Sequence, residues 1–327
     1  MAKRVLACLL CLGVCLGVTG CGAETSAQEE ATLSVVCTIF PLYDWARAIV
    51  GDTEGVEVTL LVQDGTDLHS YQPTVHDIAA ITTADVFFYV GGESDTWVLD
   101  VMDLDAYAVP YSLALVEVAD AVAEETVEGM QTETHTHDGE EEEEEEVDEH
   151  VWLSLRRASL ACQSFADLLG AADPVHAETY TENCEAYTAQ LEALDTQYAE
   201  TVAKAESPTI LVADRFPFRY LVEEYGITYY AAFPGCSAES EASFETIAFL
   251  AEALTTLSSP CILITETGDT RLSDTIQESA DITCPVLVLD SIQSVTQEEL
   301  EEGATYLGRM EDNLAVLAEA LGVEGDT

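Results

Sequence analysis

His69 and His150 are the residues of this sequence whose type and setting suggest chemistry. His69 lies in the segment 64–74, directly after the apolar run 58–62, and His150 opens the segment 150–154 much later in the chain. Imidazole is the commonest protein metal ligand and suits zinc, copper, iron and nickel. A single loop histidine is usually a solvated polar residue, but two histidines in similar settings favour a shared metal ion.

The elements that must position His69 follow from the apolar pattern of the first half of the chain. An apolar run that ends just before a polar loop predicts that His69 lies at the carboxyl end of a buried strand. In open parallel sheets this edge forms the ligand crevice. We expect strands at 34–40, 56–62 and 86–90, and helices at 42–50, 75–82 and 96–102.

The second half of the chain repeats the alternation of strands and helices. We expect strands at 209–213, 228–233, 261–265 and 286–289, and helices at 218–224, 243–257 and 305–321. Before them comes a helix at 155–169 and then a run, 175–205, without glycine or proline, whose apolar residues recur at three- and four-residue steps. At 1.5 Å per residue that helix is about 45 Å long.

The predicted fold class is therefore α/β, with two βα lobes that have central parallel sheets and are joined by one long bridging helix. We expect the first lobe at 31–173, the linking helix at 174–205 and the second lobe at 206–327.

The charge of the chain excludes one class of partner. The 327 residues carry a formal net charge of −53, which disfavours nucleic-acid binding because phosphate recognition needs basic residues. Much of the acidity gathers in residues 117–149, which contain 16 acidic and no basic residues. We interpret 124–147 as a disordered acidic insert that collects metal ions loosely or serves only as a solvated loop.

The N-terminus is typical of a processed secretion signal. Lys3 and Arg4 precede the apolar run 5–18, which is too short to span a membrane, and Cys21 follows Val18-Thr19-Gly20. This tetrapeptide resembles a bacterial lipobox, so we expect 1–20 to be removed, Cys21 to be lipidated and 21–30 to act as a tether. A diacyl anchor would hold the protein at the outer face of the cytoplasmic membrane.

Six cysteines remain after Cys21, at positions 37, 162, 184, 236, 261 and 284, without a CxxC pair or zinc-ribbon spacing. Cys261 and Cys284 each open a short apolar run. If those runs are adjacent parallel strands, the two sulfurs either bridge, as an extracytoplasmic location permits, or remain buried thiols.

At this point the chain resembles a known family, the zinc/manganese substrate-binding lipoproteins of bacterial ABC transporters. The matching segments are 36–44, 67–74, 77–79, 150–154, 220–227 and 289–290, with the acidic insert and the helix after Tyr306 in the family's order. The resemblance implies two lobes bridged by a long helix, with one divalent metal ion in the cleft between them. It also implies a monomer that delivers this ion to a permease in the cytoplasmic membrane.

The resemblance further implies a ligand set, with one departure. Two ligands map onto His69 and His150 and the last onto Asp290, but Arg215 stands where the family has His or Glu, and a guanidinium cannot ligate a cation. Asp214, one residue earlier, is our candidate for the missing ligand.

Glu239 and Glu241 are alternatives for that ligand, and a site with only three protein ligands is another. Two imidazoles with carboxylates favour zinc over manganese, which prefers more oxygen ligands.

Three other functions compete with metal capture. The first is a metallohydrolase built on the same residues. The sequence contains no HExxH, GxSxG or P-loop pattern, so we expect that the protein is not an enzyme. A surface adhesion or scaffolding lipoprotein with an altered or lost metal site is the alternative that Arg215 suggests. A cleft that takes an anionic or organic ligand would also use Arg215.

Overall fold

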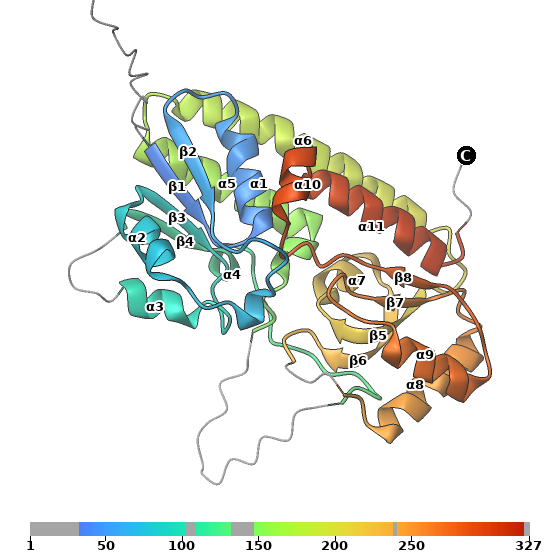
Figure 1. Ribbon diagram of the computed structural model, residues 1–327. Coiled ribbons are helices and arrows are strands. Elements are labelled where there is room, and N and C mark those ends of the chain that lie inside the picture. Colours follow the sequence, from blue (N-terminus) through green and yellow to red (C-terminus); the bar gives the residue numbers. More distant parts are fainter. Residues whose placement is uncertain (1–32, 103–108, 132–146, 238–240, 324–327) are drawn as a thin grey trace, which may run out of the picture. The chain divides into compact units, whose positions relative to one another are not determined.

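The computed structural model describes residues 33–102, 109–131, 147–237 and 241–323 (Figure 1). The predicted signal peptide, Cys21 and the tether lie outside the described residues. The described residues, from 33 onward, belong to one compact unit. None of the described helices combines the length and apolar character needed to cross a bilayer.

The first lobe is built on a parallel sheet with the strand order β2-β1-β3-β4. Its strands are β1 (Leu33–Cys37), β2 (Val56–Leu60), β3 (Val86–Tyr89) and β4 (Tyr111–Ala114). Its helices are α1 (Phe40–Val50), α2 (Val75–Thr83), α3 (Thr96–Met102), α4 (Leu115–Val118) and α5 (Leu155–Ala172). The first three strands match the prediction, whereas β4, which is short and only partly buried, was not predicted.

The second lobe has a parallel sheet with the order β6-β5-β7-β8. Its strands are β5 (Thr209–Phe216), β6 (Thr228–Pro234), β7 (Ile262–Ile264) and β8 (Val286–Val288). Its helices are α7 (Arg219–Tyr225), α8 (Phe244–Leu257), α9 (Arg271–Ala280), α10 (Gln297–Glu302) and α11 (Tyr306–Ala320). Helices α9 and α10 escaped prediction because they are largely polar: α9 buries only Ser273 and Ile276, and α10 buries no residue.

The predicted bridging helix is α6 (Ala177–Val202), a helix of 26 residues between the two sheets in the sequence. It packs against α1 and α5 of the first lobe and against α7 and α11 of the second (Figure 1). Its buried face carries the residues expected from the three- and four-residue steps, among them Tyr180, Leu191 and Tyr198. The α/β class with two parallel sheets is thus confirmed, and one hydrophobic cluster runs through both lobes.

The first part of the predicted acidic insert is ordered. Gln131 donates its backbone N–H to the carbonyl of Ala232 at 2.9 Å, and Ala123 forms an isolated antiparallel bridge with Val147. Residues 124–131 are therefore held against the second lobe, and the prediction of disorder from residue 124 is wrong for this part. The remainder of the insert lies outside the described residues.

The described cysteines all carry free thiols. Strands β7 and β8 are adjacent and parallel, as expected for the runs that follow Cys261 and Cys284, yet the two sulfurs do not form a bridge.

Asp95, just before α3, is a buried acid that should make stability depend on pH. Its side chain is 2% exposed, and Oδ2 accepts the backbone N–H groups of Val90 (2.7 Å) and Gly91 (3.3 Å). Burial raises the pKa of Asp95 to about 7, despite those two N–H donors. In the unfolded chain the pKa of an aspartate is about 3.9, so the folded state binds the Asp95 proton more tightly than the unfolded state does. The free energy of unfolding therefore rises as the pH falls from 8 towards 5.

We expect the free energy of unfolding of the metal-free protein to gain about 2–3 kcal/mol from Asp95 between pH 8 and pH 5. Asp95→Asn keeps an oxygen acceptor but cannot ionise, so it should remove this part of the pH dependence. Urea unfolding of both proteins at the two pH values, with chelator present, measures the effect. An unchanged pH dependence in the variant would contradict the assignment.

Candidate metal centre

His69 is placed by a short turn at the carboxyl edge of the first sheet. After β2 the chain forms the 3-10 turn Leu68–Ser70, capped by Asp67, whose Oδ1 accepts the backbone N–H of His69 at 3.0 Å. Ser94 holds the ring, with 2.7 Å between its Oγ and His69 Nδ1. Because Nδ1 is thus occupied, Nε2 is the nitrogen available to a ligand.

His150 is placed by Asp148, two residues earlier. Oδ1 of Asp148 lies 3.0 Å from both the backbone nitrogen and Nδ1 of His150. Asp148 therefore orients the ring from its Nδ1 side, which leaves Nε2 as the nitrogen available to a ligand. A carboxylate behind the ring is the usual support of a metal-binding histidine.

The turn that follows His150 is tied to the second lobe. The indole N–H of Trp152 donates to the carbonyl of Ser291 at 2.7 Å, and the hydroxyl of Tyr306 donates to the carbonyl of Trp152 at 2.5 Å. His150 itself is 2% exposed. Its position therefore depends on residues from both lobes, although both histidines come from the first.

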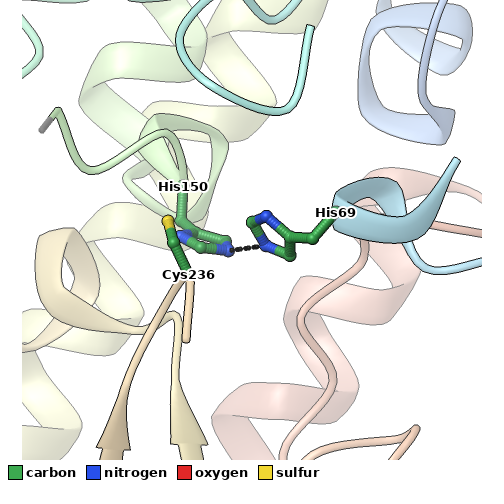
Figure 2. A group of neighbouring side chains, drawn as sticks. All are labelled: His69, His150 and Cys236. Carbon is green, nitrogen blue, oxygen red and sulfur yellow. Dashed lines mark hydrogen bonds between the residues drawn. The ribbon is translucent and has the colours of Figure 1, made fainter. Parts of the chain in front are cut away.

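The two imidazoles face each other through their Nε2 atoms, which are 3.3 Å apart (Figure 2). Two nitrogens bound to one tetrahedral zinc ion at about 2.0–2.1 Å would lie about 3.3–3.4 Å apart. Burial, followed by the charges of His150 and Arg215, lowers the pKa of His69 to about 4 against the opposing effect of Asp67 and Asp148. The His69 ring is therefore neutral at physiological pH, the form that ligates a metal.

Cys236 is the third member of this cluster, and sequence reasoning missed it. One ligand atom each from His69, His150 and Cys236 lies within 4.8 Å of the others (Figure 2). The cysteine follows the end of β6, at the same edge of the second sheet as the end of β5. That position was a usable signal, because carboxyl ends of parallel strands meet at one edge.

The two expected carboxylate ligands point elsewhere. Oδ2 of Asp214 accepts the backbone N–H (3.0 Å) and the hydroxyl (2.6 Å) of Thr265, and Oδ1 accepts the backbone N–H of Arg215. Asp214 also lies within β5 and not after it, because β5 continues past a bulge between Val212 and Arg215.

Asp290 is engaged in the same way. Its Oδ2 lies 2.8 Å from Nη1 of Arg309, and its Oδ1 accepts the backbone N–H of Ile292 at 2.7 Å. Burial and the charge of Glu266 raise its pKa to about 6. Neither Asp214 nor Asp290 belongs to the described group of three, so the structure brings together two of the four expected ligands.

Of the remaining candidates, Glu239 lies outside the described residues. Glu241 is exposed, and its backbone carbonyl accepts a hydrogen bond from the Gln131 side chain.

Arg215 lines the pocket and pairs with the His69 turn. Its Nη2 lies 2.5 Å from Oδ2 of Asp67, and both side chains are 21% exposed. The pocket has a volume of about 10 Å³ and receives residues from both lobes. Its lining consists of His69, His150, Arg215, Pro217, Gly235, Thr265, Thr267, Ser291 and Gln293.

Comparisons with known proteins place the chain in a zinc-uptake family. Residues 35–320 match the family described as zinc-uptake complex component A, periplasmic. The zinc-binding lipoprotein AdcA of Streptococcus pneumoniae is 33% identical over 299 residues, which cover 91% of this chain and 58% of AdcA. The chain thus spans little more than half the length of that relative.

A relative of similar length and a solved structure extend the comparison. The high-affinity zinc uptake system protein ZnuA of Bacillus subtilis is 30% identical over 323 residues, 98% of this chain and 97% of that protein. The crystal structure of the Zn(II)-bound ZnuA-like domain of Streptococcus pneumoniae AdcA matches with a TM-score of 0.69 and 29% identity, covering 88% of this chain and 98% of that one. Because the family match spans nearly all the described residues, this chain belongs to the family of periplasmic A components of zinc-uptake complexes.

Proposed function

We propose that the protein is a lipid-anchored extracytoplasmic binding protein that captures one zinc ion and delivers it to an ABC transporter permease. The observation that carries the proposal is the facing pair of Nε2 atoms of His69 and His150, 3.3 Å apart in a pocket between the lobes. Asp148 and Ser94 hold the two rings from behind, so the site is organised before a metal arrives.

The donor atoms and the size of the pocket select the cargo. Imidazole nitrogens suit zinc, whereas manganese prefers oxygen ligands and higher coordination. The pocket volume of about 10 Å³ is far below the roughly 300–1,000 Å³ of small-molecule sites, which favours an ion over an organic ligand. The proposal includes no catalytic step, since the family is one of transport components.

Two parts of the proposal rest on sequence and family. Lipidation of Cys21 would keep the protein at the outer face of the cytoplasmic membrane, next to the permease. Similarity to proteins named for zinc uptake supports release of the ion to the permease.

One observation favours the alternative of an adhesion or scaffolding lipoprotein with an altered site. Arg215 places a positive charge in the lining of the pocket, where it opposes a cation. Its ion pair with Asp67 offsets part of that charge, which is why zinc capture remains our proposal.

Zinc titration with and without the acidic insert tests this proposal. We expect the purified protein to bind one zinc ion tightly and further ions weakly. Replacing residues 132–146 by a glycine–serine linker should remove only the weak sites, because Gln131 and the Ala123–Val147 bridge are retained. Loss of all tight binding in this variant would place the site in the insert and overturn the proposal.

A further inference from the structure

We propose that Cys236 is the third protein ligand of the zinc ion, so that this chain holds its metal in a His₂Cys site. The inference rests on the proposed zinc capture and names a donor atom for it. Figure 2 shows the thiol beside the His150 ring, with His69 facing the same ring. One ligand atom from each of the three residues lies within 4.8 Å of the other two.

The site needs a donor that the expected carboxylates do not provide. A zinc ion held only by His69 and His150 would have half of its usual four ligands. Both oxygens of Asp214 and both oxygens of Asp290 already accept hydrogen bonds from other groups. Arg215 has no lone pair to offer. Among the described histidines, cysteines and acids, Cys236 completes the group of three around the imidazole pair.

The backbone before Cys236 is built for a close approach to His150. A Cβ atom on Gly235 would lie 3.2 Å from Cε1 and 3.3 Å from Nδ1 of His150, and 2.9 Å from the carbonyl oxygen of Phe216. Any larger residue at position 235 would push the turn away from the ring. The backbone N–H of Cys236 donates to Oε1 of Glu124 at 3.1 Å, which fixes the turn from the other side.

The charges around the thiol suit a cation. Three acidic residues, Glu149, Asp148 and Glu124, lie close enough to Cys236 to act on it electrostatically. The same three carboxylates attract a zinc ion. On binding, the S–H bond breaks, the sulfur lone pair forms the Zn–S bond, and the proton passes to solvent, which leaves one thiolate and two neutral imidazoles on the metal.

Ligation requires an adjustment of the sulfur position. With a Zn–S bond of about 2.3 Å and Zn–N bonds of about 2.0–2.1 Å, tetrahedral geometry places sulfur about 3.5 Å from each nitrogen. One ligand atom from each of the three residues lies within 4.8 Å of the other two, so ligation requires the sulfur to move closer to the imidazole pair.

Cobalt(II) is the probe that tests this assignment, since it occupies tetrahedral zinc sites and reports sulfur ligation through a charge-transfer absorption in the near ultraviolet. We expect the cobalt-loaded protein to show this band and Cys236→Ser to lose it while still binding cobalt. Zinc affinity of Cys236→Ser should fall by more than about 100-fold, because a supporting group alone is worth about 10- to 100-fold. Cys284→Ser, which removes a partly buried thiol outside the site, is the matched control and should keep both the band and the affinity.

The outcomes separate this inference from the proposed function. A wild-type protein that binds zinc tightly but shows no sulfur band with cobalt overturns the role of Cys236 and leaves zinc capture intact. A wild-type protein that binds neither metal tightly overturns zinc capture itself. Because the wild-type spectrum decides the first question, the test does not depend on the folding of any variant.

Discussion

His150→Ala should weaken zinc binding by more than about 100-fold, and His69→Ala should do the same. Loss of a group that merely supports a ligand costs about 10- to 100-fold in metal affinity, so loss of the ligand itself should cost more. Each variant removes one of the two Nε2 atoms that face each other at 3.3 Å. Competition with a chelator of known zinc affinity measures the change.

His176→Ala is the matched control for the histidine variants. His176 precedes α6, its Nδ1 lies 2.6 Å from Oδ2 of Asp173, and it is not one of the residues that line the pocket. Zinc affinity should be unchanged in this variant. Similar losses in all three variants would mean that the effect is not specific to the pocket, and circular dichroism of each metal-free variant shows whether it has folded.

Arg215→Gln should raise the zinc affinity by about tenfold or more, equivalent to about 1.4 kcal/mol. The positive charge of Arg215 is one of the causes that lower the pKa of His69, so its field disfavours positive charge at that ring. A zinc ion on Nε2 would experience the same field. Removing the guanidinium also frees the Asp67 carboxylate, which adds a negative charge beside the site.

Arg215→Lys is the control for this gain, because it keeps the charge while altering the shape. We expect it to bind zinc about as tightly as the wild type. Isothermal titration with zinc in competition with a chelator compares the three proteins. If Arg215→Gln binds more weakly than wild type, the ion pair with Asp67 matters more for holding the His69 turn than for repelling the metal.

The sequence by itself determined the class of fold and one pair of ligand candidates. Apolar periodicity located seven of the eight described strands and the long helix α6, because a two-residue or 3.6-residue repeat is a local property of the chain. It also located His69 beyond the end of a strand, where parallel sheets bind ligands. The order of the matching segments, including that around His150, indicated the family.

Only the tertiary structure decided which other groups accompany the histidines. Whether a carboxylate is available depends on partners distant in the sequence, and Asp214 and Asp290 are occupied by Thr265 and Arg309. The bulge in β5 keeps Asp214 and Arg215 within the strand, which spacing alone does not reveal. Cys236 reaches His150 because β6 lies next to β5 and Gly235 permits close contact, and strand neighbours are fixed by packing rather than by local sequence.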